Sequence, residues 1–405
     1  MRDGFTICDV DRHVIEPIAM WAEYLPRAMR AWAPALQPWP SPAETLEERL
    51  ERLGDQALSP VPPVPAVRGK PLYRGMTESA YIELGEEALR RHAAVLGSAS
   101  GRWHLDTMDA SGIDVAVLLP TYASYLVHDD EVAPEVSRAY AAAYNRWLGD
   151  LRSVDTRRLR GAAVVSCHEP GHMVSDLEAA LQHDPVAVVL RPNPVLGRTL
   201  AHPTYRPFWE ACQGNDLAVL LHEGTHARVA TAGADRFETR FGQHACSHPL
   251  EAMMALLSLV EGGVLDAHPG LRVGLLEAGC GWLPYWLWRL DEVEYSRLRA
   301  EVAAHVRRAP SEYVRAQCWV AVEAGEPCVE AAAASAGADR LVFGTDIPHL
   351  DHDDDPVGRL LGGGLPRDLV RTMLWSNAAR LLNLPATAQE PGAVPLTPPS
   401  SPSRT

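Results

Sequence analysis

Continuous apolar runs, each followed by a segment with helical periodicity, recur along most of this chain. The runs do not alternate with polar residues, which indicates strands covered on both faces, as in a parallel sheet. The expected strands are 5–10, 113–119, 161–167, 186–190, 217–221, 271–276, 318–322 and 341–343. The expected helices are 20–25, 78–96, 102–111, 134–151, 172–182, 205–213, 249–260, 282–307, 329–336, 366–374 and 376–382. Eight strands separated by helices predict an α/β fold of the (β/α)8 type, a TIM barrel, with a doubly wound open sheet as the alternative.

Two segments depart from this alternation. Residues 34–104 follow the first strand; their first part is rich in proline, and the stretch 59–65 can only be extended. A loop of this length is usually functional, so we expect this insertion to be a lid over the barrel mouth or an arm of a homodimer. Residues 386–405 are rich in Pro, Ser and Thr and predict a disordered tail, which leaves residues 1–385 as the barrel domain.

Composition and charge narrow the choice of partners. Of the 405 residues, 47% are hydrophobic and 22% are charged, as in an ordinary globular protein. A formal net charge of -15 argues against nucleic acid or an anionic membrane surface as the main partner and suits metal cations better. No apolar stretch approaches about 18 residues and the N-terminus lacks a signal-peptide layout, so we expect a cytoplasmic protein. Seven scattered cysteines without a C-x-x-C pair predict reduced thiols.

Ionisable residues follow the carboxyl ends of five of the expected strands, where a TIM barrel carries its catalytic groups. These residues are Asp11 and His13, Arg191, His222 with Glu223, Glu277, and Asp346 with His349. An Asp-x-His pair alone is more often an ordinary turn. Unpaired buried charges are costly, however, so ionisable groups that meet at one barrel mouth must be paired or bound to a metal. Two carboxylates and two imidazoles, from Asp11, His13, His222 and Asp346, would hold a divalent cation and leave a position for water.

Residues 222–226 match H-E-x-x-H, the signature of helical zinc peptidases. That chemistry needs both histidines on one face of a helix. Here the motif follows the expected strand 217–221 and contains Gly224 and Thr225, which are poor residues for a first helical turn. We therefore expect His222 to be a single metal ligand at a strand end, with Glu223 and His226 as loop residues near the pocket.

Six blocks in order resemble the amidohydrolase-2 family of metal-dependent TIM-barrel hydrolases and decarboxylases. The blocks are 11–17, 108–114, 222–224, 248–251, 277–284 and 343–349, and the resemblance runs from about residue 5 to residue 383. It implies that Asp11 and His13 match the first-strand pair of ligands, His222 the fifth-strand ligand and Asp346 the eighth-strand aspartate. The wider superfamily often has His-x-His where this chain has Asp-x-His. Zn²⁺ is the expected metal, with Mn²⁺ as the alternative because carboxylates favour harder cations.

Of the two reactions that the resemblance allows, we expect hydrolysis of an amide or related C–N bond. Asp346 would take a proton from a metal-bound water, and the hydroxide would attack a carbonyl-type carbon. His248 matches a further active-site histidine, placed at the start of a helix; it would stabilise the oxyanion or protonate the leaving group. The expected substrate-binding residues are Arg191, Glu277, Trp282 and His349. Arg191 either binds a substrate carboxylate or pairs with an acid at the rim, and Glu16 is either an oxygen ligand or a structural residue beside Pro17.

Other functions stay open at this point. A non-oxidative decarboxylase of an aromatic or unsaturated carboxylic acid is the main alternative, and a catalytically inactive metal-binding protein is another. Where this chain has Glu277, the aromatic-acid decarboxylases of the family are expected to have a run similar to Gly-His-Met. This difference favours hydrolysis. The long insertion and the aromatic cluster around Trp282 fit a small molecule or a modified peptide, such as a peptide natural product under tailoring; packing of these tryptophans within a helix is the simpler interpretation.

Overall fold

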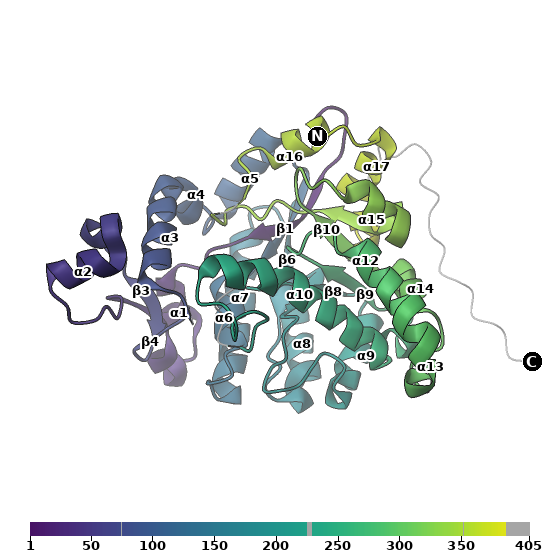
Figure 1. Cartoon of the computed structure of the whole chain (residues 1–405), viewed down its shortest axis with the longest axis horizontal. Helices are drawn as coiled ribbons and strands as arrows, with labels where there is room; N and C mark the ends of the chain where they lie inside the picture. The colour runs from purple at the N-terminus through teal and green to yellow at the C-terminus, as the bar shows by residue number, and fades with distance from the viewer. Residues whose placement is uncertain (74, 225–228, 351, 386–405) are drawn as a thin grey trace, which may run out of the picture.

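Eight parallel strands form the centre of the computed structural model, which describes residues 1–73, 75–224, 229–350 and 352–385 (Figure 1). In spatial order they are β1 (Cys8–His13), β5 (Val115–Leu119), β6 (Leu159–Val164), β7 (Ala187–Leu190), β8 (Ala218–Leu221), β9 (Arg272–Leu275), β10 (Cys318–Val322) and β11 (Leu341–Phe343). The last strand returns to the first, because the backbone N–H of Asp346 donates to Asp11 O at 2.8 Å and that of His13 to Ile347 O at 2.8 Å. The predicted TIM barrel is confirmed, and the open-sheet alternative is wrong.

Helices surround this sheet, and most of them bury one apolar face. On α7, for example, Val136, Tyr140, Tyr144 and Leu148 are buried at intervals of four residues. The helices of the barrel are α1 (Ile18–Tyr24), α5 (Gly101–Ser111), α6 (Tyr122–Val127), α7 (Pro134–Arg152), α8 (Met173–Leu181), α9 (Arg206–Gly214), α10 (Arg240–Glu261), α11 (Val264–Ala267), α12 (Leu283–Trp288), α13 (Ser296–Val302), α14 (Pro310–Gln317), α15 (Val329–Ala336), α16 (Pro356–Gly362), α17 (Arg367–Arg371) and α18 (Asn377–Leu382). No helix in the described ranges is both long and apolar enough to span a membrane.

The helix predicted for 249–260 begins earlier than the sequence indicates. Helix α10 starts after Thr239, whose side chain accepts a hydrogen bond from Gly242 N, and it continues through Pro249. Proline is favoured in the first turn of a helix, so the His-Pro step resembles a helix start in the sequence. In the structure this proline removes one N–H from the helix interior. The predicted position of His248 at a helix N-terminus is therefore wrong: His248 lies in the middle of α10.

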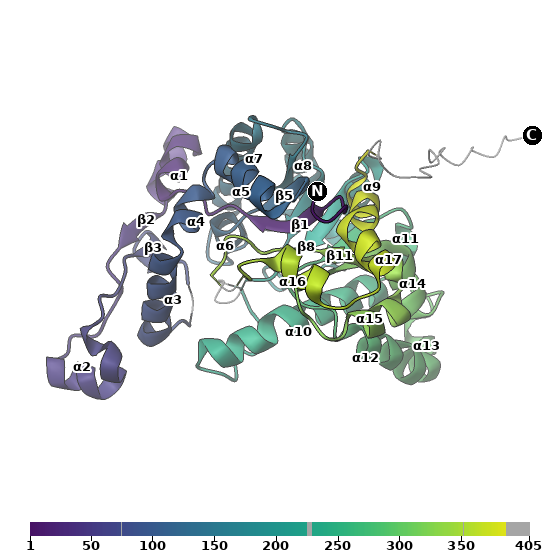
Figure 2. The same ribbon diagram turned by 90° about the horizontal axis from the view of Figure 1, so that it is seen from above.

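The insertion forms a small ordered unit beside the barrel. A three-stranded antiparallel sheet contains β2 (Ala35–Gln37), β3 (Val64–Val67) and β4 (Lys70–Pro71), and the helices of the insertion are α2 (Leu46–Leu53), α3 (Glu78–Arg90) and α4 (His92–Gly97). Figures 1 and 2 both show α2 and this sheet to one side of the barrel. Arg49 Nη1 donates to Glu78 Oε1 at 2.6 Å, which joins α2 to α3. The tail 386–405 lies outside the described residues.

Candidate metal site and substrate cavity

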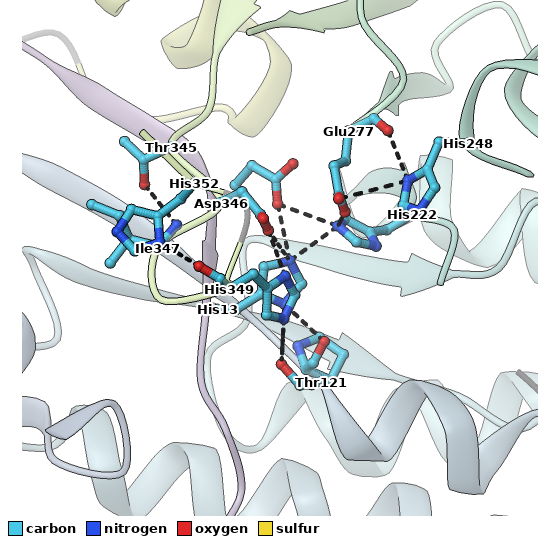
Figure 3. A network of polar contacts seen from close by, with 12 residues as sticks. His13, Thr121, His222, His248, Glu277, Thr345, Asp346, Ile347, His349 and His352 are labelled. Carbon is cyan, nitrogen blue, oxygen red and sulfur yellow. Dashed lines mark hydrogen bonds and ion pairs between the residues drawn. The ribbon is translucent and has the colours of Figure 1, made fainter. Parts of the chain in front are cut away.

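The four predicted metal ligands meet at the carboxyl end of the barrel. Asp11 and His13 belong to β1, His222 follows β8, and Asp346 follows β11. One nitrogen or oxygen atom from each lies within 4.8 Å of the others. His13 Nε2 is 3.0 Å from His222 Nε2, 3.2 Å from Asp11 Oδ1 and 3.5 Å from Asp346 Oδ1 (Figure 3). Two oxygen and two nitrogen donors thus converge on one point from three strands.

The protonation of His13 leaves its inner nitrogen available to a cation. Its Nδ1 lies 3.0 Å from Pro120 O, which can only accept, so Nδ1 carries the proton. Burial lowers the pKa of His13 to about 3, which keeps the ring neutral and the lone pair on Nε2. Asp11 Oδ1 is buried and accepts no well-aligned hydrogen bond within the described ranges. The lone pairs of His13 Nε2 and Asp11 Oδ1 face one another and repel each other unless a cation lies between them. This arrangement fits a divalent cation.

The backbone is strained at two residues of the site. Asp346 has φ +54° and Glu277 has φ +45°, a left-handed conformation that side chains other than glycine rarely adopt. Such a conformation costs roughly 1–3 kcal/mol for each residue. It persists only where the surrounding structure holds it in place, most often at functional sites. The room for Asp11 depends on Gly344, because a Cβ there would lie 2.5 Å from the Cβ of Asp11. The backbone around the cluster is therefore adapted to bring these carboxylates together.

A chain of polar contacts leads away from Asp346. His349 Nδ1 lies 2.6 Å from Asp346 Oδ1, and His349 Nε2 lies 2.9 Å from Thr121 Oγ1. The ring of His349 also stacks on that of His13, with centroids 4.0 Å apart. Since the carboxylate accepts from Nδ1, the hydroxyl of Thr121 can donate to Nε2. Thr121 was not predicted; its place two residues after β5, at the barrel mouth, is the signal that could have found it.

Glu277 lies on the other side of His222. Its Oε2 is 3.0 Å from His222 Nε2 and its Oε1 is 3.7 Å from His248 Nδ1. Burial, followed by the charge of Asp346, raises the pKa of Glu277. His222 shows the opposite effect, because Asp11 and Glu277 together outweigh its burial and raise its pKa. Glu277 and His248 are thus brought to the site as predicted.

Arg191 is almost fully buried and forms an ion pair with Glu223. Its Nη2 also donates to Gly224 O at 2.8 Å, and Asn193 Nδ2 donates to Glu223 Oε1 at 3.0 Å. Arg191 Nη1 makes no hydrogen bond within the described ranges, and the residue lines the cavity beside the cluster. The pairing with an acid is therefore present, and the structure leaves room for binding of a substrate as well.

Two other predicted residues lie away from the cluster. Trp282 packs against the core and donates from Nε1 to Gly279 O at 2.8 Å; it lines neither cavity beside the metal ligands. Glu16 accepts from the backbone N–H groups of Tyr122 and Ala123 at 2.7 and 2.9 Å, at the start of α6. The structural interpretation of Glu16 accounts for both of its oxygens. Of the H-E-x-x-H match, residues 222–224 are not helical, and His226 lies outside the described residues.

Two cavities reach the cluster. One has a volume of about 310 Å³ and contacts His13, His222, His248, Glu277 and His349. Its other walls are mainly aromatic and apolar side chains, among them Tyr73, Tyr81, Leu84, Tyr122 and Tyr125. The first three of these belong to the insertion, which therefore closes one side of the cavity. The second cavity, of about 740 Å³, contacts Asp11 and Asp346 and is lined by Glu323, Glu326, Asp353 and Asp354, with Arg91 and Arg359.

The sequence model of a known family, described as Amidohydrolase, matches residues 89–384. This chain belongs to the amidohydrolase-2 family. A γ-resorcylate decarboxylase of Polaromonas is 26% identical over 295 residues, which cover 68% of this chain and 85% of that protein. The fold resembles an amidohydrolase of Mycobacterium avium subsp. paratuberculosis, with a TM-score of 0.72 and 20% identity over 94% of this chain and 99% of that one.

A 5-carboxyvanillate decarboxylase of Novosphingobium aromaticivorans, solved with bound manganese, gives a TM-score of 0.67 with 19% identity over 95% of this chain and 98% of that one. Other curated relatives also carry decarboxylase names. The predicted hydrolysis of a C–N bond, with its peptide natural product, is therefore wrong. The two reactions use the same fold and similar metal ligands, so the residues alone could not separate them, and the acid at Glu277 favoured the wrong choice. The oxyanion and leaving-group roles of His248 belonged to that mechanism and are withdrawn with it.

Proposed function

We propose that this protein is a metal-dependent, non-oxidative decarboxylase of an aromatic carboxylic acid. The observation that carries this proposal is the decarboxylase activity named for the curated relatives of the family. The cavity beside the metal ligands supports it, because about 310 Å³ suits one substituted ring and its tyrosine walls suit an aromatic face.

The proposed metal ligands are Asp11, His13, His222 and Asp346. Mn²⁺ is preferred to Zn²⁺ because two of the four ligands are carboxylates and because a structural neighbour was solved with manganese. A divalent cation bound there supplies positive charge for the carboxylate of the substrate and for a neighbouring hydroxyl oxygen. In this arrangement the Nη1 of Arg191 can donate to an oxygen on another part of the ring.

Decarboxylation of an aromatic acid needs a proton at the carbon that carries the carboxylate. We assign this proton to Asp346, which lies at the border of both the ligand cluster and the polar chain to Thr121. As Asp346 protonates the ring carbon, the bond to the carboxylate breaks and its electron pair restores the aromatic ring, so carbon dioxide leaves. Asp346 then regains a proton from His349 Nδ1, and His349 Nε2 takes one from Thr121 Oγ1 and solvent. The sum is one proton taken up for each carbon dioxide released.

The experiment is a carbon dioxide assay on a panel of hydroxybenzoic acids, with protein loaded with Mn²⁺ or Zn²⁺. In heavy water the product should carry one deuterium at the carbon that lost the carboxylate. Asp346→Asn should reduce release by about 10³-fold or more, since it removes the proton donor and a ligand. Asp106→Asn, on the exposed face of α5, is the matched control and should behave like the unchanged protein. Amine or ammonia release from amides, without carbon dioxide from any acid of the panel, would refute the proposal.

A further inference from the structure

A second group of metal-ligating side chains lies next to the first. His244 and His248 stand one turn apart on α10, and their ring centroids are 4.7 Å apart. Together with Glu277 they offer three ligand atoms within 4.8 Å of one another. Residues at i and i+4 share one face of a helix, which is how two histidines of a single helix bind one cation. We propose that His244, His248 and Glu277 hold a second divalent cation beside the first.

The hydrogen bond of His248 prepares this residue as a ligand. Its Nδ1 donates to the backbone oxygen of Glu277 at 2.9 Å, so Nδ1 carries the proton and the lone pair is on Nε2. This is the same arrangement that Pro120 O imposes on His13 in the first cluster. Metal-ligating histidines usually donate their other N–H to a carbonyl or a carboxylate, which fixes the orientation of the ring.

The charges around Glu277 also favour a cation. Two other buried acids have arginine partners: Glu223 pairs with Arg191, and Asp9 lies 3.6 Å from Arg12. Glu277, in contrast, makes its ion-pair contacts in the described part of the chain with two histidines, His222 and His248. One divalent cation in the first cluster balances the negative charges of Asp11 and Asp346. The negative charge of Glu277 is then not balanced by that cation. A buried carboxylate in this position is stabilised when a second cation shares it.

The position of Glu277 allows it to bridge the two cations. Its Oε2 lies 3.0 Å from Nε2 of His222, a ligand of the first cluster, and one of its carboxylate oxygens lies within 4.8 Å of a ring nitrogen of both His244 and His248. Glu277 and His244 line both cavities, so this site stands between them. The larger cavity carries Glu323, Glu326, Asp353 and Asp354 against Arg91 and Arg359, and this excess of acids attracts cations toward the site. The left-handed backbone of Glu277 holds its side chain between the two groups.

The test counts metal ions. Protein stripped with a chelator is saturated with Mn²⁺, freed of loosely bound ions by gel filtration and analysed by mass spectrometry of the elements. We expect about two ions per chain, and about one for His244→Ala, because the three ligands of the second site are enough for tight binding and the two that remain in the variant are not. His172→Ala, a partly exposed histidine outside both clusters, should keep two. The electron paramagnetic resonance spectrum should show two coupled Mn²⁺ ions in the unchanged protein and an isolated ion in His244→Ala.

One ion per chain at saturation in the unchanged protein would overturn the proposal, and so would two ions retained in both His244→Ala and His248→Asn. The count in the unchanged protein decides even if a variant fails to fold. It needs no substrate and does not rest on the proposed decarboxylation. Two ions without carbon dioxide release would refute the decarboxylation alone, whereas one ion with release would refute the second site alone.

Discussion

Replacement of Arg191 by methionine separates its structural role from its proposed role in binding the substrate. Methionine fills a similar volume but leaves the carboxylate of Glu223 without its cation. The side chain of Glu223 is only 2% exposed, so water cannot replace the arginine. Removal of one partner from a buried ion pair costs about 3–5 kcal/mol, and this is the expected loss in the free energy of unfolding for Arg191→Met.

The double variant Arg191→Met, Glu223→Gln removes the stranded charge while it keeps an amide that Asn193 can bond. We expect it to recover most of the loss, to within about 1–2 kcal/mol of the unchanged protein. Urea unfolding, followed by the fluorescence of the 11 tryptophans, measures both variants. A loss below about 1 kcal/mol for Arg191→Met, or an equal loss for both variants, would refute the assignment of a buried ion pair.

The same double variant then reports on binding. Because its stability is restored, an increase in KM with little change in kcat would indicate that Nη1 of Arg191 donates to the substrate. An unchanged KM would show that Arg191 only holds the loop at Gly224.

Three further outcomes are expected. Asp11→Asn should weaken Mn²⁺ binding strongly, because it removes a ligand. Mutation of a residue that only hydrogen-bonds a ligand lowers the affinity for the metal roughly 10–100-fold, and we expect a larger loss here; titration of the stripped protein with Mn²⁺ checks this. Glu16→Gln should cost about 1–2 kcal/mol, because the amide has one accepting oxygen for the two backbone N–H groups at the start of α6, yet it should leave the metal count unchanged; loss of metal would instead make Glu16 a ligand. Burial, assisted by Arg12, lowers the pKa of His104 to about 3, so the folded protein keeps this ring neutral while the unfolded chain protonates it below about pH 6.5. Stability should therefore fall by about 1.4 kcal/mol per pH unit from this residue between pH 6.5 and pH 3, and urea unfolding of His104→Gln should show a slope that is shallower by this amount; an equal slope would contradict it.

Much of the fold was predictable because each strand of the barrel is buried on both faces. The run at 113–119, for example, became β5, and its residues from Ala116 to Leu119 are fully buried. Helix boundaries were less predictable. The start of α10 depends on the side chain of Thr239 as a cap, whereas Pro249, inside the helix, is the stronger local signal of a helix start.

The strand-end rule placed the ligand residues at the mouth but not their partners. Thr121 and His244 carry no pattern of their own: one follows a strand as many threonines do, and the other is one helix residue among several. Their positions at the site follow from contacts across long separations, such as His349 with Thr121, 228 residues apart. The type of reaction could not be predicted from the residues either, because the same metal ligands fit hydrolysis and decarboxylation. Only the named activities of the relatives distinguished the two.

The sequence by itself determined the eight-stranded barrel and the end of it that carries chemistry, because apolar runs must be buried and parallel strands end on one face. The tertiary structure decided which of these groups meet and in which state. His13 exposes the lone pair of Nε2 to the cluster because its Nδ1–H donates to Pro120 O, 107 residues away, and His222, 209 residues away, contributes the second imidazole. Such states depend on the three-dimensional neighbours of a side chain, which local patterns do not encode. The same reason explains why Glu16 lies at a helix start and why Glu277 stands between two groups of histidines.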